Sequence, residues 1–238
     1  MMARAAVARA ACALACVAAS AHAFALAPAS ACTRWGTPGK QLHADDFNGG
    51  LAQWTVEAKP GVTVSAADNR MLIDAPTGVT VWLREPLSGN VVINYTRTVI
   101  LEGGPHDRLS DLNNFWMASD PRNASLFTRD GTLEQYDALQ LYYIGMGGNT
   151  NSTTRFRRYD GHGARPLLGE SSAPADLLVA NHPYRIEIAV YEGCTRMLVD
   201  GRELFAYRDP QPLRSGYFGL RTTWSRQSIS AFTVRALD

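Results

Sequence analysis

The sequence has little net charge, few cysteines and almost no helical periodicity, and each shortage excludes a class of protein. Its 238 residues carry a net charge of +1, which gives no electrostatic basis for binding nucleic acid or an anionic membrane surface. None of its four cysteines lies in a Cys-x-x-Cys pair or a Cys/His cluster, so a structural zinc site is not expected. Beyond the first two dozen residues, no segment approaches the roughly 20 apolar residues that span a bilayer.

The first 23 residues have the pattern of a secretory signal peptide. Arg4 and Arg9 form a basic start, an Ala-rich apolar stretch follows, and Ala21-His22-Ala23 is a small-x-small cleavage signal. We therefore expect a mature protein that is secreted or periplasmic and begins near Phe24, with no integral membrane segment.

Two cysteines remain after removal of this segment, Cys32 and Cys194. In an exported protein they are candidates for one disulfide, and the alternative is two unpaired thiols. A lipidated Cys32 is a further alternative, which the absence of a preceding leucine disfavours.

From His43 onward the pattern is strand, turn, strand, and only residues 173–179 could form a helical turn or two. Residues 185–190 alternate with a period of two, which places Ile186, Ile188 and Val190 on a core face. Asp200-Gly201 between two short strands is a hairpin signal. Many short strands without helices predict an all-β fold, a two-sheet antiparallel jelly-roll sandwich. We assign residues 24–42 to an N-terminal tail and residues 43–238 to one sandwich domain, expected to be a monomer.

Several segments resemble known proteins. The opening DDFNGGLxxW at residues 45–54, with the closing strands over 185–221, resembles concanavalin A-like lectin/glucanase domains. The blocks 108–116 and 142–159 resemble a family of secreted bacterial proteins known only as a domain of unknown function and linked to polysaccharide breakdown. The resemblance implies a jelly-roll fold and a carbohydrate context. The retaining-glucanase pattern Glu-x-Asp-x-x-Glu is absent, which argues against that hydrolase chemistry.

The segment 139–160 carries the main candidate site, because it predicts a hairpin with one polar face. With a turn at residues 147–150, Tyr142 would face Arg155 and Gln140 would face Arg157, all on one side of the sheet. Arginine binds carboxylates in a bidentate manner, and tyrosine stacks on sugars and transfers protons. This face predicts a subsite for an acidic glycan; the alternative is a solvated sheet face. Further ligand-like residues in the segment are Asn149, Asn151 and Tyr159.

Other candidates lie outside the hairpin. Asn114 and Trp116 would face the groove if Phe115 and Met117 faced the core, or Trp116 would itself fill the core. His106, on a Gly-Gly-Pro loop, is either a general base or an exposed loop histidine. On a late loop, Trp224 and Arg226 either line the rim of a groove or cover the sandwich edge.

The adjacent acids Asp45 and Asp46 are candidate ligands of a structural calcium ion, although calcium needs about six to eight oxygen ligands. No other cofactor is expected. The partner expected from the residue types is a poly- or oligosaccharide.

The favoured hypothesis is a polysaccharide lyase that acts on a uronate-containing glycan. Arg155, with Asn149 and Gln140, would neutralise the uronate, and Tyr142 would serve as base, acid or both, with His106 as a second choice. One alternative is a glycoside hydrolase, which needs two carboxyl groups about 5–9.5 Å apart. The carboxylates available for it are Asp111, Glu134, Asp137 and Asp160. The other alternative is a non-catalytic, lectin-like binding module.

Overall fold

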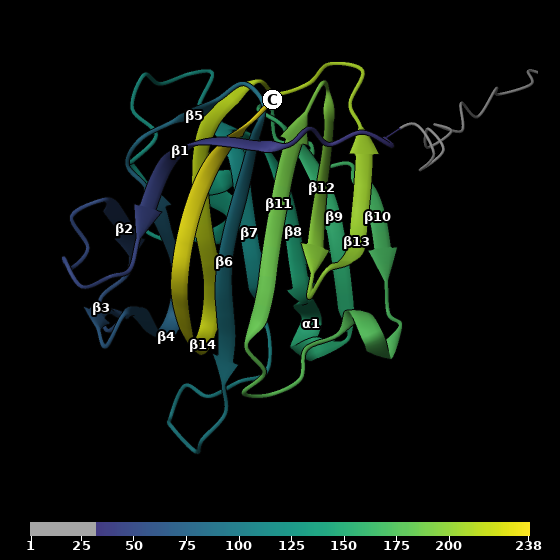
Figure 1. Cartoon of the computed structure of the whole chain (residues 1–238). Helices are drawn as coiled ribbons and strands as arrows, with labels where there is room; N and C mark the ends of the chain where they lie inside the picture. The colour runs from purple at the N-terminus through teal and green to yellow at the C-terminus, as the bar shows by residue number, and fades with distance from the viewer. Residues whose placement is uncertain (1–31) are drawn as a thin grey trace, which may run out of the picture.

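The computed structural model describes residues 32–238 as almost continuous antiparallel strand (Figure 1). The strands are β1 (Pro38–Asp45), β2 (Trp54–Ala58), β3 (Thr63–Ala67), β4 (Arg70–Leu83), β5 (Leu87–Ser88), β6 (Val91–Ile100), β7 (Leu112–Ser119), β8 (Gln140–Gly147), β9 (Thr153–Asp160), β10 (Leu167–Ser171), β11 (Tyr184–Tyr191), β12 (Cys194–Val199), β13 (Arg202–Arg208) and β14 (Ser215–Leu237). Three short helical turns interrupt them: η2 (Leu133–Tyr136), α1 (Gly148–Asn151) and η3 (Pro174–Asp176). The predicted signal peptide lies outside the described residues.

The strands form two layers, so the predicted all-β jelly-roll sandwich is confirmed (Figure 1). We call the layer that contains β10, β9, β8, β7 and the first part of β14 the pocket layer. The opposite layer contains β13, β12, β11, β6 and the second part of β14. β14 belongs to both because it bends where its register against β4 shifts between Thr223 and Ser225.

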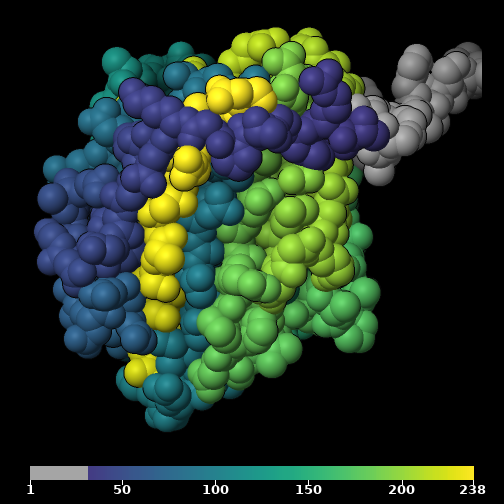
Figure 2. Space-filling view, viewed as in Figure 1, coloured from purple at the N-terminus to yellow at the C-terminus, as the bar shows by residue number. Residues whose placement is uncertain are grey.

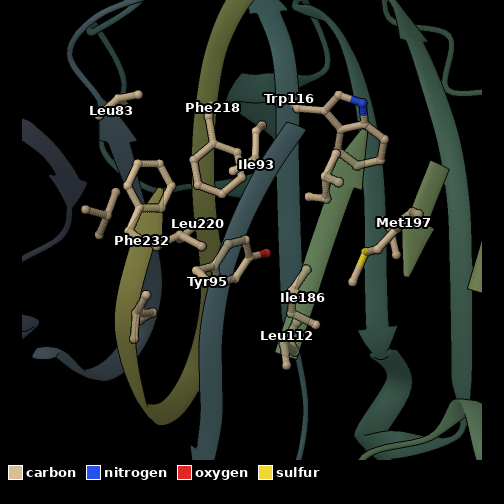
Figure 3. Close-up of a cluster of buried hydrophobic side chains, with 14 of the residues drawn as sticks. Leu83, Ile93, Tyr95, Leu112, Trp116, Ile186, Met197, Phe218, Leu220 and Phe232 are labelled. Atoms are coloured by element: carbon tan, nitrogen blue, oxygen red, sulfur yellow. The ribbon is translucent and has the colours of Figure 1, made fainter. Parts of the chain in front are cut away.

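The main core lies between the two layers. Ile186, Ile188 and Val190 all point into it, as the alternation in their segment predicted. Figure 3 shows part of this cluster, with side chains from β6, β7, β11, β12 and β14 meeting in the interior. Fully burying a large apolar side chain stabilises a fold by about 1.5–3 kcal/mol, so this cluster is the main source of cohesion between the layers.

A second apolar cluster lies on the outer side of the pocket layer. Trp82, Phe115 and Tyr136 are fully buried there, and Tyr159 is nearly so. The buried carboxylate of Glu57 accepts hydrogen bonds from Trp82 Nε1 at 2.8 Å and from the Tyr136 hydroxyl at 2.9 Å. These contacts hold the η2 segment against the sheet and provide a rigid base beside the site described below.

The N-terminal segment is tied across the strand ends. Figure 2 shows it in purple, lying over the C-terminal part of the chain. Strand β1 begins at Pro38, inside the segment expected to be a tail, because its backbone pairs with the end of β14. Cys32 and Cys194 form a disulfide with a Cα–Cα distance of 5.9 Å. Over residues 32–238, no helix is long and apolar enough to cross a membrane.

Candidate functional site

A pocket of about 540 Å³ lies on the outer face of the pocket layer, over β7, β8, β9 and β14. The loop of residues 131–134 contributes a further wall. The charged and polar side chains that line it include Lys59, Asp111, Asn113, Glu134, Tyr143, Asn149, Arg155, Arg157, Tyr159, Arg165 and Arg221. Five cationic and two anionic side chains in this set give the pocket an excess of positive charge.

The strand register explains which side chains meet. Gly145 of β8 pairs with Arg155 on β9 and with Asn113 on β7, and Asn113 pairs with Arg221 on β14. These residues therefore cross the sheet as one row, and side chains on such a row share a face. Tyr143 lies two residues before Gly145, so it projects from the same face.

The Tyr143 hydroxyl is free to bind a ligand. Gly145 makes room for it, because a Cβ atom at that position would overlap the hydroxyl and lie 2.7 Å from Asn113 Oδ1. Among residues 32–238 neither the hydroxyl nor Asn113 Oδ1 has a hydrogen-bond partner, and Asn113 Oδ1 is buried. Burial raises the pKa of Tyr143, so the side chain is a neutral phenol that can donate a proton.

Arg221 places a charge without a counter-ion in the same pocket. The residue is only 3% exposed, and its Nη1 atom donates to neutral acceptors, Thr80 Oγ1 at 3.0 Å and the Gly131 carbonyl at 2.9 Å. No carboxylate of the described chain forms an ion pair with it, and burial lowers its pKa. A buried charge without a counter-ion is costly, so a guanidinium in this state is suited to binding an anion.

Arg97 supports the same row from beneath. It reaches across the interior from β6 and is fully buried. Its Nη1 atom donates to the Asn113 carbonyl at 2.8 Å, and its Nη2 atom donates to the Arg221 carbonyl at 2.9 Å. Its pKa is lowered to about 10, mainly by burial. One guanidinium therefore fixes the backbone of two residues that line the pocket.

The predicted pairing within the hairpin is wrong. Tyr142 pairs with Arg158, not with Arg155, so it lies on the opposite face of the sheet from Arg155 and Arg157. Its hydroxyl donates to Asp209 Oδ2 at 2.6 Å between the layers, where burial raises its pKa. The observed register differs from the predicted one by three residues. Because three is an odd number, the shift moves every side chain of one strand to the other face relative to its partner strand.

The cause of that shift is the connection between β8 and β9. The sequence suggested a turn at residues 147–150, whereas Asn149, Thr150 and Asn151 all adopt left-handed conformations with φ of 52°, 58° and 57°. Three successive left-handed residues lengthen the loop. Such conformations are unfavourable for residues other than glycine, and asparagine tolerates them best.

The other hairpin candidates are distributed differently. Arg155, Arg157, Asn149 and Tyr159 line the pocket, as the hypothesis of a polar face required. Asn151 does not line it; its side chain instead binds the backbone of Leu178. Gln140 is outside the pocket as well, and its Nε2 atom donates weakly to the Asp160 carbonyl at 3.4 Å.

Asn114 and Trp116 do not face the pocket, and of the two alternatives given for Trp116 the structure shows the one in which it fills the core. Both side chains point between the layers, where Trp116 belongs to the main core (Figure 3). Trp116 Nε1 donates to Thr195 Oγ1 at 2.9 Å, and Asn114 accepts a hydrogen bond from the Tyr95 hydroxyl. Phe115 takes the outer face. Alternation alone does not say which of two apolar faces is the interior, and here both faces are covered.

The loop candidates lie beside the pocket rather than in it. His106 Nδ1 is 2.7 Å from Asp74 Oδ1, and neither side chain lines the pocket. Arg226 is held by Asp107, with its Nε 2.8 Å from Asp107 Oδ1. Trp224, by contrast, is 54% exposed and adjoins Thr223, which does line the pocket.

The candidate calcium ligands are occupied by protein groups. Asp45 accepts hydrogen bonds from the Phe47 backbone at 2.7 Å and from Trp54 Nε1 at 2.8 Å. Asp46 accepts from the Asn48 backbone, which lowers its pKa. Within residues 32–238 no group of three or more His, Cys, Asp or Glu side chains is arranged to hold a metal ion.

Five charged or polar residues of the site were missed from the sequence: Lys59, Asn113, Tyr143, Arg165 and Arg221. With the correct register for the hairpin, the sequence would have placed Tyr143 opposite Arg157 as a cross-strand pair. Asn113 and Arg221 give no local signal, since they meet only through the pairing of β7 with β14.

The fold is similar to several solved structures. One is a protein of unknown function with a galectin-like fold from Bacillus subtilis, with 16% identity and a TM-score of 0.70, covering 84% of this chain and 98% of that one. Another is the endo-β-1,3-glucanase from Pyrococcus furiosus, with 9% identity and a TM-score of 0.59, covering 84% and 95%. The carbohydrate binding module CBM66 from Bacillus subtilis has 12% identity and a TM-score of 0.54, covering 77% and 96%. At these identities the likeness establishes the concanavalin A-like fold alone.

No curated protein gives a significant match. A family model does match, over residues 73–232, and its description is "Domain of unknown function (DUF6250)". The matched region holds every strand of the pocket layer that contributes to the row of Arg155, Gly145, Asn113 and Arg221. Because it spans more than half of the sequence, the chain belongs to the DUF6250 family.

Proposed function

We propose that this protein is an exported polysaccharide lyase that cleaves a uronate-containing glycan in the pocket over β7, β8, β9 and β14. The observation that carries the proposal is the buried Arg221 guanidinium, which faces the pocket without a carboxylate partner beside the free Tyr143 hydroxyl. The glucanase and binding-module names among the similar structures support a carbohydrate as the ligand class.

In the proposed reaction, Arg221 binds the uronate carboxylate and stabilises the negative charge that develops as the C5 proton leaves. Asn113 Oδ1, buried and without a partner, accepts a hydrogen bond from a sugar hydroxyl. The C5–H electron pair forms the C4–C5 double bond, and the bond from C4 to the glycosidic oxygen breaks. No oxidant or reductant is required.

Tyr143 acts as the general acid. Its raised pKa keeps the phenol protonated, so its hydroxyl donates a proton to the departing glycosidic oxygen. Asp111 is the base for the C5 proton in this scheme: it lines the same pocket, and of its two carboxylate oxygens Arg108 binds Oδ2. Water returns the proton from Asp111 to Tyr143 after product release.

One observation favours a second candidate, a glycoside hydrolase. Asp111 and Glu134 both line the pocket, whereas Asp137 forms an ion pair with Arg165 at 3.0 Å. A pair of carboxyl groups is what glycoside hydrolysis requires. The excess of arginine and the free tyrosine favour the lyase.

The test is to incubate the mature protein with polyuronates and record the ultraviolet absorbance of the unsaturated product. We expect product from the wild type and none from Tyr143→Phe at an equal folded fraction. Tyr142→Phe is the matched control, because the neighbouring tyrosine faces the core and should affect stability alone. Formation of new reducing ends without an increase in ultraviolet absorbance would indicate a hydrolase instead of a lyase. Binding of the glycan without any turnover would indicate a lectin.

A further inference from the structure

Two arginines in the pocket lack a carboxylate partner, and they lie on either side of Tyr143. Arg157 is the direct cross-strand partner of Tyr143, and Arg221 lies two strands away on the other side. Both guanidiniums act electrostatically on the Tyr143 hydroxyl. Among the described residues no ion pair involves either arginine.

The other arginines around the pocket are neutralised by the protein itself. Arg155 pairs with Glu170, Arg165 with Asp137 at 3.0 Å, and Arg108 with Asp111. Of these five arginines, the chain supplies counter-ions to three and omits them at Arg157 and Arg221. Uncompensated charges facing a shared pocket are suited to a ligand that brings its own negative charges.

The two free arginines come from strands that are not neighbours in the sheet, which favours two separate anionic groups over one shared carboxylate. Their backbones are separated by three strand spacings, about 14 Å at roughly 4.8 Å each. Each side chain is also held by a backbone carbonyl group. Arg221 Nη1 donates to Gly131 at 2.9 Å, and Arg157 Nη1 donates to the Arg165 carbonyl at 2.7 Å.

We propose that the substrate carries an acidic group on each of the two sugars that flank the cleaved bond, one bound by Arg221 and the other by Arg157. The inference rests on the lyase function proposed above and specifies its substrate class. Contiguous uronates satisfy it, and so does a uronate that alternates with a sulfated sugar, because guanidinium binds both kinds of anion. A glycan in which uronates alternate with neutral sugars offers no second anionic group to Arg157.

The test measures binding in a Tyr143→Phe background, so that turnover does not interfere. Three sets of oligosaccharides of equal length are compared: contiguous uronates, uronates alternating with sulfated sugars, and uronates alternating with neutral sugars. Adding Arg157→Gln should weaken binding of at least one of the first two sets about tenfold, as expected for a lost charge-assisted hydrogen bond, and leave the third unchanged. Which set responds identifies the second acid as carboxylate or sulfate. Arg185→Gln is the control, because its side chain is 79% exposed on the opposite layer.

An equal effect of Arg157→Gln on all three sets, or no effect on any, would overturn the inference. Binding of none of the sets would overturn both this inference and the lyase. Selective binding together with an absence of unsaturated product from the wild type would retain the two-charge subsite and refute the lyase alone.

Discussion

Substituting Gly145 by alanine should disable the site without unfolding the protein. The new Cβ atom would overlap the Tyr143 hydroxyl and lie 2.7 Å from both Asn113 Oδ1 and the Tyr143 Cζ atom. Gly145 does not have a positive φ, so alanine meets no backbone strain there. The groups that must move are the far end of the Tyr143 side chain, which is the proposed acid, and the side-chain amide of Asn113.

The expected magnitudes differ for stability and for activity. Forcing a methyl group into a filled site costs about 1–3 kcal/mol, and the lower end applies here because a mobile ring tip can yield. The lower backbone entropy of the unfolded alanine variant offsets about 0.4–1 kcal/mol of that cost. Displacing a catalytic group by about 1 Å, by contrast, lowers the rate on the order of 100-fold.

The assay combines a denaturant melt with initial rates of unsaturated product formation. Gly148→Ala is the matched control, since Gly148 lines the same pocket but its Cβ atom would come no closer than 3.5 Å to Thr153 Oγ1, an ordinary contact. We expect normal rates from Gly148→Ala and the hundredfold loss from Gly145→Ala. Full activity of a folded Gly145→Ala variant would refute the requirement for Tyr143 in its observed position.

Three further predictions concern stability. The double variant of Cys32→Ser and Cys194→Ser removes a link across 162 residues, so chain entropy predicts a loss of up to about 5 kcal/mol in urea unfolding, and an unchanged midpoint would contradict it. The Arg226 hydrogen bond lowers the pKa of Asp107 to about 2, below the value of about 3.9 in an unfolded chain. The stability from this carboxylate is therefore complete above about pH 5 and lost as the pH falls towards about 2, and Asp107→Asn should flatten urea midpoints measured over that range. Chelator should leave the melting temperature unchanged, because Asp45 is bound by protein donors; a lowered melting temperature would restore the calcium hypothesis.

Strand positions were predictable because local alternation reports them. The segment with Ile186 and Ile188 has one apolar face and one polar face, so its orientation followed directly. The segments around Trp116 and Tyr142 have apolar residues on both faces. The pairing of Tyr142 depended on the length of a loop with three left-handed residues, and the orientation of Trp116 depended on packing between the layers; composition reveals neither.

The fold class, the presence of a Tyr- and Arg-rich hairpin, and the assignment of Arg155, Arg157 and Tyr159 to one face were all predictable from the sequence. Those properties depend on residues near one another in the chain. Tertiary structure alone decided that Tyr143 rather than Tyr142 enters the pocket, and that a buried arginine from the last strand lies beside it. The physical reason is that strand register and long-range pairing are set by loop geometry and by packing between layers.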